Sequence, residues 1–141
     1  MANLTDLTSK EFLTELASAA PAPGGGGGAA MAGALAAALS SMVCNLTLGK
    51  ERFAAQEAEV QSVLTKAERA RERLLELVQE DAAVFNSFMS CYKLPKSTDE
   101  EKAVRTAAIR EAAKKAAEVP LAIARESFAV LELADELVVC G

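Results

Sequence analysis

The sequence predicts an all-α protein, a bundle of long helices. Aromatic residues make up only 4% of the 141 residues and tryptophan is absent, whereas alanine is abundant. Alanine has the highest helix propensity, and its small side chain allows helices to pack closely. Apolar residues recur at spacings of three and four, without the alternation typical of strands. The length suits one domain with a hydrophobic core, so residues 1–141 are expected to form a single helical domain.

A capping box predicts the first helix. Thr8 is followed three residues later by Glu11, a pair that bonds reciprocally to the backbone at helix starts. Phe12, Leu13 and Leu16 then fall on one face of the expected helix. The segment rich in proline and glycine that follows ends it.

A second helix is expected over residues 28–48, and Gly49 ends it. Its apolar character on all sides is typical of a central helix. Residues 29–48 carry no charge and have about the length of a membrane span, but alanine is only weakly hydrophobic. We therefore expect burial within protein and no membrane partner. Small residues that permit close helix packing are Gly33, Ala34, Ala37, Ala38 and Ser41.

The third helix is expected over residues 51–92. Its apolar stripe comprises Val60, Leu64, Ala67, Leu74, Val78, Phe85 and Phe88. A carboxylate, Asp81, stands between Val78 and Phe85 and interrupts this stripe. Pro95 closes the segment, because the residue before a proline disfavours helix.

A second capping box, Thr98 with Glu101, predicts the start of a fourth helix. Its stripe comprises Val104, Ala108, Ile109 and Ala112. Pro120 either kinks this helix or begins a fifth one. The apolar residues expected in that last part are Leu121, Ile123, Phe128, Leu131 and Leu137.

Composition excludes several classes of function. The net charge of −5 argues against binding to nucleic acid. Histidine is absent, which excludes histidine triads and histidine metal ligands. Cys44, Cys91 and Cys140 lack the spacing of a metal site and are expected to be reduced thiols. No signal-peptide pattern opens the sequence, so a cytoplasmic location is expected.

The glycine-rich segment before the second helix is the first candidate site. Pro23 precedes five consecutive glycines, Gly24, Gly25, Gly26, Gly27 and Gly28. Glycine lets a ligand approach the backbone, and a helix start offers unpaired N–H groups at the positive end of its dipole. One hypothesis is a site for a phosphate or a carboxylate. The other is a flexible joint that also allows close helix packing.

Asp81 is the candidate catalytic residue. A carboxylate among apolar neighbours is suited to act as a general base or acid near neutral pH. The alternative is a salt bridge to an arginine or lysine of a neighbouring helix.

Tyr92, Lys93 and Lys96 lie together near the end of the third helix, where they can contact an anionic ligand. The alternative is that these cations only complement the helix C-terminus. Arg105, one turn into the fourth helix, is a further ligand candidate. Its spacing also suits an ion pair with Glu101.

Five segments in this order resemble the cyclodeaminase/cyclohydrolase family over nearly the whole chain. This family comprises the cyclodeaminase part of formiminotransferase-cyclodeaminase and the stand-alone methenyltetrahydrofolate cyclohydrolases. The segments are Pro23–Gly26, Met42–Lys50, Asp81–Phe85, Tyr92–Lys102 with Arg105, and Glu118–Leu121.

The resemblance implies a helical homodimer that binds folate, without a cofactor beyond the tetrahydrofolate substrate and without a metal. Stand-alone members hydrolyse 5,10-methenyltetrahydrofolate to the 10-formyl compound. Fused members release ammonia from 5-formiminotetrahydrofolate. The family's proton acceptor falls on Asp81. We further infer from charge that the glycine segment holds a polar edge of the folate, and that Lys93 and Lys96 meet its glutamate tail.

The resemblance also marks two differences. Gly27 stands where the family usually has serine, and the family continues after the position of Cys140 and Gly141 with a further helix of small residues. The expectation is therefore a family domain without its last helix. Two alternatives to the cyclohydrolase remain open, a cyclodeaminase and a helical assembly module that does not catalyse.

Overall fold

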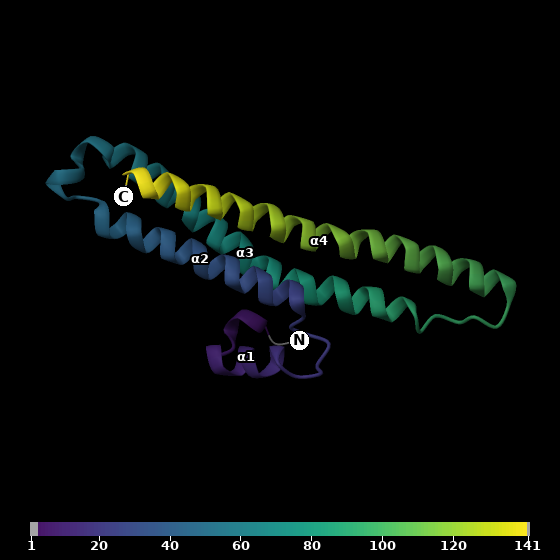
Figure 1. The fold of residues 1–141 in the computed structure, drawn as a ribbon. Helices are drawn as coiled ribbons and strands as arrows, with labels where there is room; N and C mark the ends of the chain where they lie inside the picture. Colours follow the sequence, from purple (N-terminus) through teal and green to yellow (C-terminus); the bar gives the residue numbers. More distant parts are fainter. Residues whose placement is uncertain (1–2, 141) are drawn as a thin grey trace. The chain divides into compact units, whose positions relative to one another are not determined.

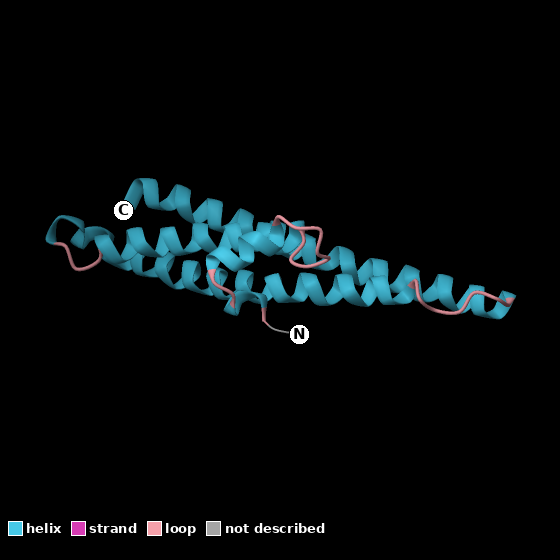
Figure 2. Cartoon of the chain, turned by 90° about the horizontal axis from the view of Figure 1, so that it is seen from below, coloured by secondary structure: helices cyan, strands magenta, loops and turns pink. Residues whose placement is uncertain are grey.

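A computed structural model describes residues 3–140 and consists of helices and loops (Figures 1 and 2). The elements in order are the short 3-10 helix η1 (Leu4–Asp6), α1 (Ser9–Leu16), α2 (Gly25–Thr47), the 3-10 helix η2 (Glu51–Gln56), α3 (Glu57–Cys91) and α4 (Asp99–Cys140). No strand occurs within residues 3–140, so the predicted all-α class is confirmed.

Both predicted capping boxes are formed. At α1, Thr8 Oγ1 accepts from the Glu11 backbone N–H at 3.2 Å, and the Thr8 N–H donates to Glu11 Oε2 at 2.9 Å. At α4, Thr98 and Glu101 make the same two bonds at 3.1 and 3.2 Å. Such a cap contributes about 1 kcal/mol by satisfying N–H groups that the first helical turn leaves unpaired.

Helix α2 begins three residues earlier than predicted, because Gly25, Gly26 and Gly27 themselves form its first turn. The Gly28 N–H donates to the Gly24 carbonyl at 3.0 Å, a bond of the helical type. At the other end, Gly49 has a φ of +74°, the left-handed conformation expected of a glycine that ends a helix.

Helix α4 continues through Pro120, so the alternative of a separate fifth helix is wrong. A proline within a helix removes one backbone hydrogen bond. Val119 and Ile123, one on either side of Pro120, are both buried. Burial of apolar side chains on both sides of the proline supports a continuous helix despite the lost bond.

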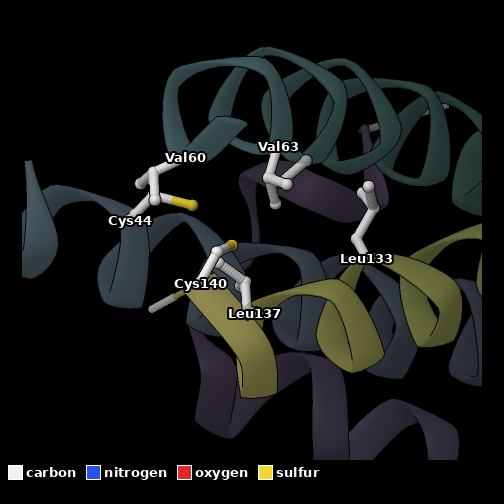
Figure 3. Close-up of a cluster of buried hydrophobic side chains, with 7 residues drawn as sticks. Cys44, Val60, Val63, Leu133, Leu137 and Cys140 are labelled. Atoms are coloured by element: carbon white, nitrogen blue, oxygen red, sulfur yellow. The ribbon is translucent and has the colours of Figure 1, made fainter. Parts of the chain in front are cut away.

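The chain groups into two compact units. One comprises the N-terminal segment through Gly28 together with Leu77–Ala122, and the other comprises Ala29–Glu76 together with the segment from Ile123 onward. In the second unit, α2, α3 and α4 contribute side chains to one apolar cluster (Figure 3). Its members are Cys44, Val60, Val63, Ala67, Leu133, Leu137 and Cys140.

The three cysteines are free thiols, as predicted. Burial raises the pKa of both Cys44 and Cys140 above the ordinary thiol range. These two thiols therefore stay protonated at neutral pH and act as small apolar side chains in the cluster.

The apolar stripes are less completely buried than predicted. Helix α2 is not buried on all sides, since Leu35 is 63% exposed. Further predicted core residues that are exposed are Leu13, Phe85, Val104, Leu121, Phe128 and Leu131. Helix α2 is also long and apolar enough to cross a membrane by length and composition, and 39% of its most apolar window is buried. The apolar stripes predicted from the sequence are thus wider than the helix faces that neighbouring helices bury.

Gly33 lies at a close helix contact in the second unit. A Cβ at this position would be 2.8 Å from Ser127 Oγ and 3.2 Å from Leu74 Cδ1. The small residue thus brings α2 close to α3 and α4, as the sequence predicted.

We predict that Gly33→Ala lowers the free energy of unfolding by about 1–3 kcal/mol, because the extra methyl group overpacks this contact. Gly25→Ala is the matched control, because it adds the same methyl group to the same helix in open space. Thermal and denaturant unfolding measure both variants. Equal effects of the two substitutions would contradict the close contact at Gly33.

Candidate active site

The Asp81 carboxylate meets the first turn of α2. The backbone N–H of Gly27 donates a hydrogen bond to Asp81 Oδ2 at 2.9 Å. This bond joins two residues that are far apart in sequence and places the candidate base of α3 against the glycine segment. The partner of Asp81 is therefore a backbone N–H, in place of the arginine or lysine of the alternative hypothesis.

Helix geometry explains why this carboxylate lies here. The N–H groups of a first helical turn have no partner within the helix, and the helix dipole is positive at this end. A capping side chain normally accepts from the second or third of these groups, but Gly24, just before α2, has no side chain. Asp81 supplies the missing acceptor from α3 and bonds to the third residue of α2.

The approach of Asp81 depends on the absence of a side chain at Gly26. A Cβ built at Gly26 would lie 2.6 Å from Asp81 Cγ, well inside van der Waals contact. At Gly25 the same Cβ would have nothing within 4 Å, and at Gly24 it would be 3.9 Å from Asp81 Oδ2. The adjacent glycines thus differ sharply in what they contribute to the site.

Gly27 packs closely against Pro23 and Val78. Pro23 is buried, and a Cβ at Gly27 would stand 3.5 Å from its Cβ and 3.6 Å from the Val78 backbone carbonyl. Val78 and Ala82 on α3 are buried, whereas Asp81 between them is half-buried. The carboxylate therefore combines a fixed position with partial access to solvent.

Of the other predicted residues, Tyr92 and Arg105 form a second cluster, together with Phe88. Arg105 on α4 donates from Nη2 to the Tyr92 carbonyl at 3.4 Å, and its guanidinium carbon is 5.4 Å from the centre of the Tyr92 ring. Phe88 packs edge-on against Tyr92 with 5.3 Å between ring centres. Phe88 is predicted from the sequence only as part of the apolar stripe, although its spacing of four residues from Tyr92 on a helix is a usable signal for this contact.

Arg105 and Glu101 each have other partners than the ion pair considered from the sequence. Glu101 Oε2 accepts from the backbone N–H groups of Ser97 and Thr98 at 2.7 and 3.2 Å, and so caps α4. Arg105 instead contacts Tyr92. Its Nε is buried and has no hydrogen-bond partner within residues 3–140.

Among residues 3–140, the cluster of Tyr92 and Arg105 lies apart from Asp81 and the glycine segment. The part of α3 between Asp81 and Cys91 rises by about 15 Å along the helix axis. Lys93 and Lys96 are exposed in the loop beyond this end of α3. A ligand that touches both clusters must therefore be elongated. Within residues 3–140, no group of three or more His, Cys, Asp or Glu side chains is placed to hold a metal ion.

Comparison with known proteins identifies the family. The model of the formiminotransferase-cyclodeaminase family matches residues 8–141. A methenyltetrahydrofolate cyclohydrolase from Methylorubrum extorquens is 51% identical over 128 residues, which are 91% of this chain and 62% of that protein. A formimidoyltransferase-cyclodeaminase from Sus scrofa is 36% identical over 94% of this chain and 24% of its own length. This chain thus spans less than two thirds of either relative.

A solved structure shares the fold. The formiminotetrahydrofolate cyclodeaminase from Thermotoga maritima superposes with a TM-score of 0.70 and 27% sequence identity, covering 95% of this chain and 74% of that one. The resemblance noted from the sequence is confirmed by these matches. The chain belongs to the formiminotransferase-cyclodeaminase family.

Proposed function

We propose that this chain belongs to a folate one-carbon enzyme that hydrolyses 5,10-methenyltetrahydrofolate to 10-formyltetrahydrofolate. The observation that carries the proposal is the Asp81 carboxylate, held at the glycine turn by the Gly27 N–H. The 51% identity to a protein named methenyltetrahydrofolate cyclohydrolase supports it.

The chemistry needs a base next to a cation. The methenyl carbon lies between two nitrogens in an amidinium cation, and water adds to this carbon. The Asp81 carboxylate stabilises the cation and accepts the proton that the water loses. The bond between the carbon and N5 then breaks, N5 takes up a proton, and the hydroxyl on the carbon loses its own proton, so that the carbon remains on N10 as a formyl group.

The second cluster suits the anionic end of a folate. Lys93 and Lys96 supply positive charge in an exposed loop, and the Arg105 guanidinium adds a further positive charge beside Tyr92. Folates are elongated, with the one-carbon unit at one end and the glutamate tail at the other. The tail would therefore meet this cluster when the methenyl carbon is at Asp81.

We further propose that the enzyme is a cytoplasmic homodimer. The three free thiols favour a reducing compartment. Helix α2 exposes Leu35, Leu39, Met42 and Leu46, and contiguous exposed apolar residues favour a protein interface. We infer that this face of α2 binds a second copy of the chain, because soluble oligomers are most often symmetric homodimers.

The cyclodeaminase reaction is the second candidate. It is favoured by the fold of the Thermotoga maritima protein and by the Sus scrofa relative, whose names include that activity. A helical assembly module without catalysis is the remaining alternative. Activity on each of the two folates separates these three possibilities.

We predict that Asp81→Asn lowers kcat for 5,10-methenyltetrahydrofolate by about 10²–10⁴-fold, because an amide cannot accept the proton. The amide oxygen can still accept from Gly27 N–H, so the fold should persist. The decay of substrate absorbance measures activity, and thermal unfolding measures the fold. Asp135→Asn, at an exposed position of α4, is the matched control.

Unfolding of Asp81→Asn would instead assign Asp81 a structural role. A folded wild-type protein that converts only formiminotetrahydrofolate would establish the cyclodeaminase. A folded protein that converts neither folate would favour the assembly module.

We predict that Lys93→Gln with Lys96→Gln raises KM for polyglutamylated substrate by about 1.4- to five-fold per lysine and leaves kcat unchanged. Exposed ion pairs contribute about 0.2–1 kcal/mol each, and salt weakens them. Steady-state kinetics with monoglutamate and polyglutamate substrates measure the effect. Lys114→Gln with Lys115→Gln, exposed on α4, is the control pair. Equal KM values for both pairs would contradict tail binding by the loop.

We predict that Leu39→Glu on the exposed face of α2 converts the dimer to a monomer, because it buries a charge in the interface. Sedimentation equilibrium measures the mass. Leu13→Glu, which changes an exposed leucine of α1, should leave the dimer intact. A monomeric wild-type protein would refute the proposed dimer.

A further inference from the structure

We propose that Gly26 and Gly27 are positioning residues for Asp81, Gly27 by donating a hydrogen bond to the carboxylate and Gly26 by leaving the space that the carboxylate occupies. This inference rests on the proposed function, in which Asp81 is the base. It changes the role expected for these two glycines, from contacts with the substrate to parts that hold the catalytic carboxylate in place.

Gly27 fixes one oxygen. Its backbone N–H lies 2.9 Å from Asp81 Oδ2. It belongs to a helix of 23 residues that begins at Gly25, so the donor is part of a rigid element and carries the positive end of a helix dipole. The bond holds Oδ2 in place and restricts rotation of the carboxylate group.

Gly26 leaves room for the carboxylate. A Cβ built at Gly26 would collide first with Asp81 Oδ1, and it would also lie 2.7 Å from Oδ2. The carboxylate therefore fits against the start of α2 only because Gly26 has no side chain.

The contrast with Gly25 shows that the constraint is specific. A Cβ at Gly25 would have nothing within 4 Å, although both glycines are in the first turn of α2. The carboxylate of a short side chain can move aside when a methyl group appears at position 26. A displaced carboxylate leaves the fold intact but loses the Gly27 bond.

The experiment is a double-mutant cycle in kcat with wild type, Gly26→Ala, Asp81→Ala and the double variant. Gly26→Ala is expected to lower kcat by about 10- to 100-fold with KM unchanged, because the displaced Asp81 carboxylate is no longer aligned with the attacking water. In the Asp81→Ala background the same substitution should have no further effect on kcat, because no carboxylate remains to be displaced.

A second measurement reports the position of the carboxylate without turnover. Protein labelled with ¹⁵N-glycine gives signals for only eight glycines. The Gly27 amide proton should shift upfield in Gly26→Ala, toward its position in Asp81→Ala, and should stay unchanged in Gly25→Ala.

Three outcomes would overturn the inference. One is a Gly26→Ala variant with wild-type kcat. The second is a raised KM with unchanged kcat, which would make Gly26 a substrate contact. The third is an equal loss of kcat in both backgrounds, which would separate Gly26 from Asp81. If wild type converts neither folate, the proposed function fails, and the Gly27 amide shift alone still decides whether Gly26 positions Asp81.

Discussion

The candidate active site depends on one hydrogen bond, from the Gly27 backbone N–H at the start of α2 to the carboxylate of Asp81 on α3. It pairs the positive end of a helix dipole with a negative side chain, and it satisfies an N–H group that the helix itself leaves unpaired. Because the acceptor comes from another helix, the same bond that caps α2 also fixes α3 against it. The glycines allow this approach, since a side chain at Gly26 would occupy the space of the carboxylate.

This arrangement gives a different meaning to the glycine-rich segment. The sequence pattern indicated an anion site at a helix start, and the structure places an anion there, the chain's own Asp81. A carboxylate of the ligand at the same point would face like-charge repulsion. A cation such as the methenyl group of a folate would instead be attracted. In the proposed function, this local charge therefore favours the one-carbon end of the folate at the glycine turn and the glutamate tail elsewhere.

The features that the sequence predicts well are those with local causes. The capping boxes at Thr8 and Thr98 and the helix end at Gly49 each involve residues within a few positions of one another, so spacing alone reveals them. Asp81 was identified because it interrupts an apolar stripe. Its bond to Gly27 was beyond sequence reasoning, since it depends on how α2 and α3 are placed in space.

The residues that were wrongly predicted to be buried share one physical explanation. An apolar stripe shows that a helix has a face suitable for burial, but a neighbouring element must be present to cover it. Phe85 and Val104 lie on predicted stripes and are nevertheless exposed. Pro120 was ambiguous for a similar reason, because a proline lowers helix stability locally and buried side chains on both sides can offset that cost.

The separation of the two clusters follows from the rigidity of α3. Asp81 and the end of this helix are related by its fixed rise, about 15 Å along the axis, so the base and the Tyr92 region cannot collapse onto a small ligand. In the proposed function, only an elongated substrate places its reactive carbon at Asp81 and its anionic tail near Lys93 and Arg105 together. Binding energy gained at the tail would then help to hold the reactive carbon at the carboxylate. The rise of α3 would thus match the length of the substrate, and the charge at the glycine turn would select the end that is attacked.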